Sequence, residues 1–175
     1  MSAQAIRQYN TLVAILSLVA IAAALGLLVY RMARGRDTSH VLGDRAIWLA
    51  WLVALACTAG SLFYSEVIGF EPCRLCWFQR IAMYPMAVIL IVGAIRREAQ
   101  VKFYALPLAL GGLAVSIWHY LIQTFPALEG GGSCGAVPCS ARYVEVFGFI
   151  SIPFMAGAGF IVISVLLALY TRVER

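Results

Sequence analysis

Five long stretches without a charged residue constrain the fold of this 175-residue chain more than any other feature. A helix needs roughly 20 apolar residues to cross the hydrocarbon core of a bilayer. Hydrophobic residues make up 63% of the chain and charged residues 12%, against about 45–50% and about 25% in average usage, so most of the chain requires lipid as its solvent. We therefore expect an all-α integral membrane protein with helices at 8–30, 46–65, 81–95, 103–128 and 146–171.

The third stretch is too short to cross a membrane by itself. Its 15 residues rise about 1.5 Å each and span only about 22 Å. We therefore expect this helix to begin near Cys76 and to include Arg80, roughly one turn inside the span. Two interpretations stay open: an arginine that snorkels to the headgroups, or a functional charge, which is the default for an ionisable residue at membrane depth.

Basic residues gather in the connections on one side of these helices. Nine of the thirteen Lys and Arg residues lie in the connections at 31–45 and 96–102 and in the tail after residue 171. Because positive charge marks the cytoplasmic side, we expect a multi-pass protein of a bacterial-type cytoplasmic membrane with its C-terminus in the cytoplasm. The N-terminus and both loops that carry cysteine pairs are then outside. The net charge of +5 reflects this orientation, and without a basic stripe with interleaved aromatics we expect no nucleic-acid partner.

The first helix does not have the pattern of a cleaved signal peptide. Its apolar run is longer than the 7–15 residues of a typical signal, and arginines follow it. We expect residues 1–44 to form an additional transmembrane helix with a basic cytoplasmic loop, and residues 45–175 to form a four-helix domain.

Four of the five cysteines form two pairs at the ends of expected helices. Cys73 and Cys76 are the ends of a C-x-x-C motif, and Pro72 before them suits the first turn of a helix. The helix dipole favours a thiolate at this end, and Arg80 shares a helix face with Cys76. A thiolate is the nucleophile of disulfide exchange, so this pattern favours catalysis.

Cys134 and Cys139 flank a short segment of the one long polar loop. A disulfide in a water-exposed loop is of the exchangeable kind. Two other interpretations of the four cysteines stay open, a pair of static structural disulfides and a zinc site, but no hydrated domain surrounds them and we expect no metal. Cys57 lies in the middle of an expected helix, where a lone cysteine behaves as a small hydrophobe.

His119 is the other polar group at membrane depth, and Gln123 lies four residues on, on the same helix face. A lone histidine is often only a hydrogen-bonded bundle residue. The alternative is a proton donor, or a hydrogen-bond donor to a carbonyl of a lipid-soluble quinone, because quinone reduction consumes protons and histidine titrates near neutral pH.

Three blocks of sequence resemble the disulfide bond formation protein B (DsbB) family, most closely its short BdbC-type members. The first runs from Glu71 through the C-x-x-C motif to Pro85, the second from Trp118 to Gln123, and the third combines 137–140 with 147–153. The vitamin K epoxide reductases, which are similar in bundle and chemistry, carry their loop cysteines before the pair at the helix mouth, whereas here that pair comes first.

The resemblance implies a four-helix core that reoxidises an extracytoplasmic thioredoxin-fold thiol oxidase and passes the electrons to a membrane quinone, ubiquinone or menaquinone. The redox-active disulfides would be Cys73–Cys76 and Cys134–Cys139. By this resemblance Cys134 forms the mixed disulfide with the partner, Cys139 bridges transiently to Cys73, and Cys76 faces the quinone. The residues assigned to quinone binding are Arg80, Trp77, His119 and Gln123.

The chain departs from the family pattern in two ways. The first helix is additional to the usual four, and the loop cysteines are closer together than in long-loop members, so we expect no horizontal amphipathic helix between them. A different class of function also fits four exoplasmic cysteines, namely a non-catalytic membrane scaffold or transporter subunit with structural disulfides. Such a scaffold has no need of Arg80 inside a span or of a cysteine pair at a helix N-terminus.

Overall fold

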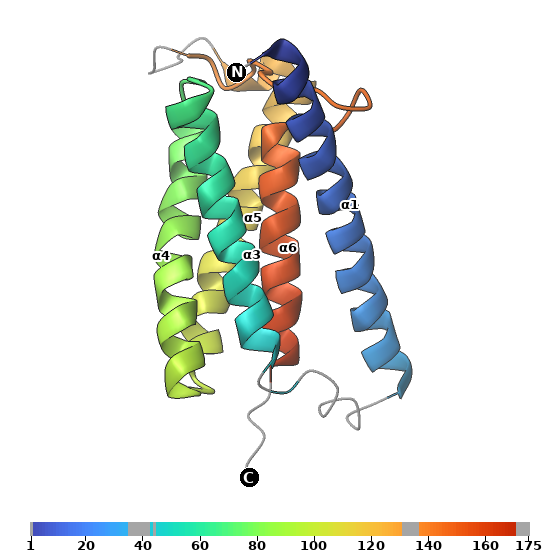
Figure 1. Ribbon diagram of the computed structural model, residues 1–175, viewed down its shortest axis with the longest axis vertical. Helices are drawn as coiled ribbons and strands as arrows, with labels where there is room; N and C mark the ends of the chain where they lie inside the picture. Colours follow the sequence, from blue (N-terminus) through green and yellow to red (C-terminus); the bar gives the residue numbers. More distant parts are fainter. Residues whose placement is uncertain (1, 35–42, 44, 131–136, 171–175) are drawn as a thin grey trace.

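The computed structural model describes residues 2–34, 43, 45–130 and 137–170, and in this part of the chain it is an α-helical bundle (Figure 1). Five of its helices are long and apolar enough to cross a membrane, which confirms the expected all-α multi-pass architecture. The helices are α1 (Ala3–Arg34), α3 (Arg45–Leu62), α4 (Arg74–Arg96), α5 (Val101–Thr124) and α6 (Ile152–Leu169).

Helices α3 to α6 form a four-helix core, and α1 packs beside α6 (Figure 1). The centre of the core is apolar, with Met86, Leu90 and Phe160 completely buried. The N-terminus lies at the same end of the bundle as the start of α4 and the segment 137–151, whereas the last turn of α1 lies at the other end (Figure 1). The bundle therefore gathers the N-terminus and the described cysteine segments at one end.

Helix α4 begins at Arg74 and has Cys73 as its N-cap, so it extends beyond the charge-free stretch as expected. The last apolar stretch was predicted less well, because α6 begins at Ile152 and not near residue 146. Residues 146–150 form a tight turn in which Phe147 and Gly148 have positive φ angles of 54° and 77°. The backbone N–H groups of Val146 and Ile150 each donate to the other residue's carbonyl oxygen at 2.9 Å, and this pairing excludes helix there.

Small residues let the core helices approach closely, but not at every glycine. A Cβ added to Gly112 would overlap the Phe160 ring, and one added to Gly159 would lie 2.5 Å from Cys57 Sγ. The small side chains of the sequence at 111–112 and 156–159 suggest close approach at Gly111 as well, but a Cβ there meets nothing within 4 Å, because Gly111 is exposed on the outer side of α5.

Two irregular turns lie near the cysteines. Helix α3 ends in a π-helical turn, η2 (Phe63–Val67), a feature frequent at functional sites. Helix α5 ends at Thr124, and a single 3₁₀ turn, η3 (Pro126–Glu129), follows it. No amphipathic helix occurs between α5 and α6 in the residues described there, 125–130 and 137–151.

Candidate thiol–disulfide site and adjoining cavity

The C-x-x-C motif forms the first turn of α4. Cys73 is the N-cap residue in an extended conformation, and its thiol donates to Cys76 Sγ across 3.5 Å. Both are free thiols, as are Cys57 and Cys139, while Cys134 lies outside the described residues. The structure therefore represents the motif in its reduced form.

Cys139 comes next to this motif although it lies more than 60 residues further along the chain. It forms one buried cluster with Cys73 and Ile122, against which Leu75 and Cys76 pack. The Sγ atoms of Cys73 and Cys139 lie within 4.8 Å of each other. Two thiols at this separation need only a small movement to form a disulfide, whose S–S bond is about 2.05 Å.

Glu129 holds Cys139 in this position. Its two carboxylate oxygens accept from consecutive backbone N–H groups, Oε1 from Cys139 at 2.5 Å and Oε2 from Ser140 at 3.2 Å. A hydrogen bond with the Ser140 side chain is the main cause that lowers the pKa of the Glu129 carboxyl from its ordinary value, and the two backbone hydrogen bonds lower it further. A carboxylate that stays ionised makes charge-assisted bonds, which are roughly twice as strong as neutral ones.

His119 on α5 lies between the two cysteine segments. Its Nδ1 is 3.4 Å from Gln79 Nε2, and its Nε2 is 3.1 Å from the Cys139 carbonyl oxygen and 3.5 Å from Cys73 Sγ. An amide NH₂ can only donate, so Nδ1 accepts and the ring proton is on Nε2. His119 therefore presents an N–H donor to Cys139 O and to Cys73 Sγ.

The thiols of Cys73 and Cys139 both resist ionisation in the reduced form. The pKa of Cys73 is raised to about 11, first by its hydrogen bond to Cys76 and then by burial. Burial raises the pKa of Cys139 to about 11 as well. Because only the thiolate attacks a disulfide, these two sulfurs react fastest at alkaline pH or when a neighbouring donor stabilises the anion.

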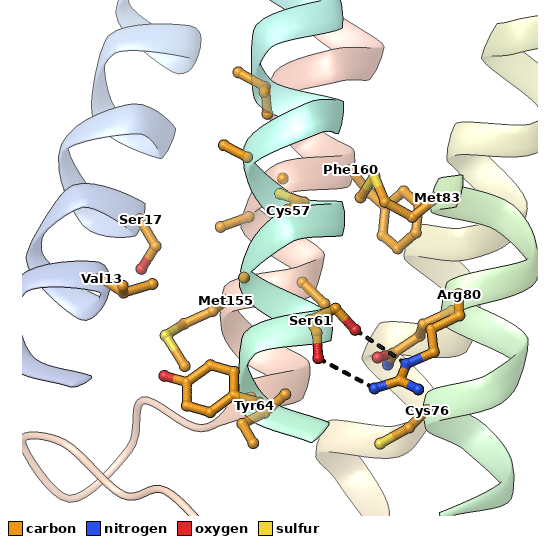
Figure 2. A pocket seen from close by; sticks show the side chains of 18 of the residues that line it. Val13, Ser17, Cys57, Ser61, Tyr64, Cys76, Arg80, Met83, Met155 and Phe160 are labelled. Carbon is orange, nitrogen blue, oxygen red and sulfur yellow. Dashed lines mark hydrogen bonds between the residues drawn. The ribbon is translucent and has the colours of Figure 1, made fainter. Parts of the chain in front are cut away.

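Arg80 reaches from α4 across to α3 (Figure 2). Its Nε donates to Ser61 Oγ at 3.0 Å, its Nη2 donates to the Ser61 carbonyl oxygen at 3.2 Å, and its guanidinium lies 5.1 Å from the centre of the Trp77 ring. Arg80 is only 9% exposed, and no carboxylate of the described residues lies within 4.0 Å of it. A buried cation without an anionic partner favours the functional interpretation over snorkelling.

A cavity of about 520 Å³ adjoins Arg80 and Cys76 (Figure 2). Its polar end includes Ser61 and Tyr84, whose hydroxyl donates to Ser61 Oγ at 3.2 Å. The remainder is walled mainly by apolar side chains of α1, α3 and α6. An apolar space with a few convergent polar groups is the usual form of a small-molecule site.

The four residues assigned to quinone binding from the sequence separate into two groups in space. Arg80 lines the cavity, and Trp77 packs under its guanidinium without lining the cavity itself. His119 and Gln123 are both buried on the side of the cysteine segments. Gln123 Nε2 donates to the Ala141 carbonyl oxygen at 3.0 Å and so ties the chain that follows Cys139 to α5.

Comparison with known proteins decides the family. The sequence model described as "Disulfide bond formation protein DsbB" matches residues 43–170. The chain belongs to the DsbB family. The matched range contains α3 to α6 and every described residue of the cysteine site, so this chain is a multi-pass membrane member of a family of disulfide-forming oxidoreductases.

Two relatives agree with this assignment. The chain is 45% identical over 124 residues to disulfide bond formation protein C of Bacillus subtilis, covering 70% of this chain and 90% of that protein. It is 48% identical over 131 residues to a probable disulfide formation protein of Oceanobacillus iheyensis, covering 74% and 90%. No solved structure matches the chain. The resemblance seen in the three sequence blocks is thereby confirmed at the level of the family, and the chain is a disulfide-formation protein.

Several residues of this DsbB-family site carry no signal in the sequence. Ser61 and Gln79 lie within ordinary helical stretches, and Glu129 is one loop carboxylate among several. Each takes its place only through contacts across the bundle, Ser61 with Arg80, Gln79 with His119 and Glu129 with Cys139. The sequence predicts that Cys76 and Arg80 are neighbours, because they are four residues apart on one helix. It does not predict these contacts between separate elements.

The DsbB-family site also offers three metal-ligand atoms close together. The ligand atoms of Cys73, His119 and Cys139 all lie within 4.8 Å of one another. Thiolate and imidazole ligands suit zinc and other soft ions. A structural zinc site usually has four protein ligands, and the same three residues are already placed for thiol chemistry, so we expect no resident metal here.

Proposed function

We propose that this chain is a quinone-dependent thiol oxidase, which reoxidises an extracytoplasmic thioredoxin-fold thiol oxidase and passes the electrons to a membrane quinone. The single observation that carries the proposal is that a buried Arg80, with no anionic partner among the described residues, lies with Cys76 on the wall of one apolar cavity. A scaffold or transporter subunit with structural disulfides has no use for this combination.

The residues around the cavity fit a quinone. The guanidinium of Arg80 is a fixed cation for the oxygen that becomes negative when a quinone is reduced, and the apolar walls suit its hydrocarbon part. A bound quinone supplies an acceptor for two electrons and two protons. Ubiquinone and menaquinone make the same demands on these side chains.

Electrons would enter through the loop cysteines. A thiolate of the partner attacks Cys134 and breaks the Cys134–Cys139 disulfide, which frees the Cys139 sulfur next to the helix-mouth pair. Cys139 then attacks Cys73 and breaks the Cys73–Cys76 disulfide, and the electron pair is left on Cys76. The partner's second thiol attacks the mixed disulfide, which leaves the partner oxidised and Cys134 reduced. When Cys134 attacks Cys139, the loop disulfide re-forms and Cys73 departs as a thiolate, which leaves Cys73 and Cys76 reduced beside the cavity.

His119 would act on sulfur in this sequence. Its Nε2–H lies 3.5 Å from Cys73 Sγ and is anchored to the Cys139 carbonyl oxygen. It can therefore stabilise the Cys73 thiolate at the moment Cys73 is the leaving group. Gln79 fixes the tautomer that makes this possible, since its amide donates to Nδ1.

Glu129→Gln should slow disulfide formation between Cys139 and Cys73 about tenfold. The substitution removes the charge that holds two consecutive N–H groups. A hydrogen bond to a charged group contributes about 1.5–3 kcal/mol, and about 1.4 kcal/mol corresponds to a tenfold change in an equilibrium constant. The measurement is peptide mapping while a soluble disulfide reagent oxidises protein in which Cys134 and Cys76 are both serine, so that Cys73 and Cys139 are the pair left at this end.

Glu145→Gln is the matched control, because Glu145 lies in the same segment as Cys139, 137–151, but pairs with Arg142 at 3.4 Å. Equal rates in Glu129→Gln and Glu145→Gln would mean that the carboxylate does not position Cys139. In protein that keeps Cys76, the rate should rise about tenfold per pH unit from about pH 7 to about pH 10, because the Cys76 hydrogen bond and burial raise the pKa of Cys73 to about 11 and burial raises that of Cys139 to about 11.

Arg80→Lys should raise the apparent KM for quinone about tenfold while partner oxidation in a single turnover changes little. Lysine keeps the charge but loses the fork that holds both Ser61 atoms and presents parallel donors. Arg74→Lys is the control, because Arg74 is an exposed arginine of the same helix. Unchanged quinone dependence in Arg80→Lys would reduce Arg80 to a structural anchor of α3.

We propose that the cysteine end of the bundle faces the exoplasm. The connections at 31–45 and 96–102 and the tail after residue 171 carry nine of the thirteen basic residues in the sequence, which supports this orientation. After mild reduction of intact cells, a membrane-impermeant thiol reagent should label Cys134. Protection of Cys134 until the membrane is opened would reverse the orientation and remove access for an extracytoplasmic partner.

The whole proposal is tested by anaerobic titration of purified protein with a reduced thioredoxin-fold partner and either ubiquinone or menaquinone. Stoichiometric oxidation of partner thiols with reduction of one quinone per disulfide is expected. Cysteines that stay oxidised while the partner stays reduced would instead favour the structural-disulfide alternative.

A further inference from the structure

Helix α1 lies outside the region that defines the DsbB family, which begins at residue 43, yet it is fastened to the core at both ends. Near its start, the hydroxyl of Tyr64 donates to Asn10 Oδ1 at 2.9 Å. Near its end, Arg31 Nη1 donates to the Leu169 carbonyl oxygen at 3.4 Å. An additional helix held in this way is part of the folded bundle and has a fixed position against it.

Helix α1 also supplies one wall of the cavity. Val13 and Ser17 face Cys57 and Met155 across the open space (Figure 2). The Ser17 hydroxyl donates to the Ala14 carbonyl oxygen of its own helix at 2.7 Å, so apart from the Tyr9 hydroxyl this wall is effectively apolar. The residues of α1 that line the cavity are Tyr9, Val13, Leu16, Ser17 and Ala20.

The cavity has two chemically distinct parts. Cys76, Arg80 and Ser61 form a polar end between α3 and α4, and the part beside α1 is built from apolar side chains of α1, α3 and α6. An occupant that satisfies both parts has a polar head and a hydrocarbon tail. The cavity volume of about 520 Å³ is typical of a site for a small molecule.

The outer rim of the cavity is covered by a row of aromatic rings. The ring centres of Tyr9 and Tyr64 are 5.6 Å apart, those of Tyr64 and Phe70 are 5.9 Å apart, and those of Phe70 and Tyr143 are 4.7 Å apart. Leu16, by contrast, lines the cavity and is 56% exposed on the flank of the bundle. The cavity is therefore roofed toward the cysteine end and open sideways, toward lipid.

We propose that α1 forms one side of a channel that holds the polyprenyl tail of the quinone and leads it from the head site at Cys76 and Arg80 out to the lipid. This inference rests on the proposed function, since the head site is the one assigned there. It gives the additional helix a role that the family core does not supply: Val13, Leu16 and Ala20 would determine how tightly a tailed quinone binds.

Two matched pairs of substitutions in the full-length protein test the channel. Val13→Trp fills it from α1, and Leu12→Trp, at a neighbouring residue that is 57% exposed and does not line the cavity, is its control. Gly60→Leu fills it from α3, where an added Cβ lies 3.6 Å from the Tyr9 hydroxyl oxygen. Gly111→Leu is its control, because a Cβ there meets nothing within 4 Å.

The measurement is the KM for a quinone with a polyprenyl tail and for the same ring without a tail, with a reduced protein dithiol as electron donor. Val13→Trp and Gly60→Leu should raise the KM of the tailed compound about tenfold and that of the tail-free ring less than twofold. The two controls should behave as the parent protein does.

Equal effects within either pair, or equal changes for tailed and tail-free compounds, would overturn the channel. If Val13→Trp does not fold, as judged by its melting temperature, Gly60→Leu decides alone. Failure of the proposed function has a different signature, because the parent protein itself would then reduce neither compound.

Discussion

Cys76→Ser should reduce quinone reduction to the background rate, and Cys73→Ser should do the same. Cys76 Sγ lines the cavity with Arg80, and Cys73 is the one cysteine of the described residues whose thiol donates to it. A serine hydroxyl does not form a disulfide, so each substitution removes the pair that must hold the two electrons. The measurement is anaerobic quinone reduction by a reduced protein dithiol.

Cys57→Ala is the matched control for these variants. Cys57 also lines the cavity, but it packs against Gly159 in the wall, and none of the other described thiols lies within hydrogen-bonding distance of it. Its turnover should stay near that of the parent protein. Full activity in Cys76→Ser would contradict the assignment of Cys76 as the sulfur that faces the quinone. Loss of activity in Cys57→Ala would show that turnover depends on the side chain at this position of the cavity wall, and Cys57→Ala would then not serve as a control.

The parts of the site that lie on one helix were predictable from the sequence. Apolar length located the spans, Pro72 and the C-x-x-C motif located the start of α4, and the four-residue spacing placed Arg80 with Cys76. These inferences use only local geometry, which the sequence carries directly. The start of α6 was not predictable in this way, because the turn at 146–150 is apolar and has no charge to mark it.

Contacts between helices were beyond the sequence. His119 was assigned to quinone binding for its proton chemistry, and Gln123 because it shares a face of α5 with His119. That this face packs against the cysteine segments could be seen only in the folded bundle. Which face of a helix meets which neighbour depends on packing of the whole bundle, and one sequence without that packing cannot decide it. The same holds for α1, whose place on the cavity wall follows from its fastening at Asn10 and Arg31.

Cys139→Ala should cause a mixed disulfide between Cys134 and the partner protein to accumulate. In the proposed sequence, Cys139 carries electrons from the loop to Cys73, and its sulfur lies within 4.8 Å of Cys73 Sγ inside the protein. With alanine there, Cys134 is a lone thiol. Its thiolate can attack the disulfide of the oxidised partner, which breaks that bond and frees the partner's second thiol, and no loop sulfur is left to displace the partner from Cys134. Only a small difference in reduction potential between the successive disulfides is needed to drive electrons along this path, because about 30 mV corresponds to about 1.4 kcal/mol for a two-electron couple.

A non-reducing gel of cells that carry Cys139→Ala and the partner should show the adduct as a shifted band, which disappears on reduction. The double variant Cys134→Ala with Cys139→Ala is the control, and it should show no band. Both variants carry alanine at position 139, the residue whose backbone N–H donates to Glu129. Any general loosening of this segment is therefore the same in the two. A partner trapped on Cys73 or Cys76 in the double variant would mean that electrons enter at the helix mouth and that the loop pair is structural.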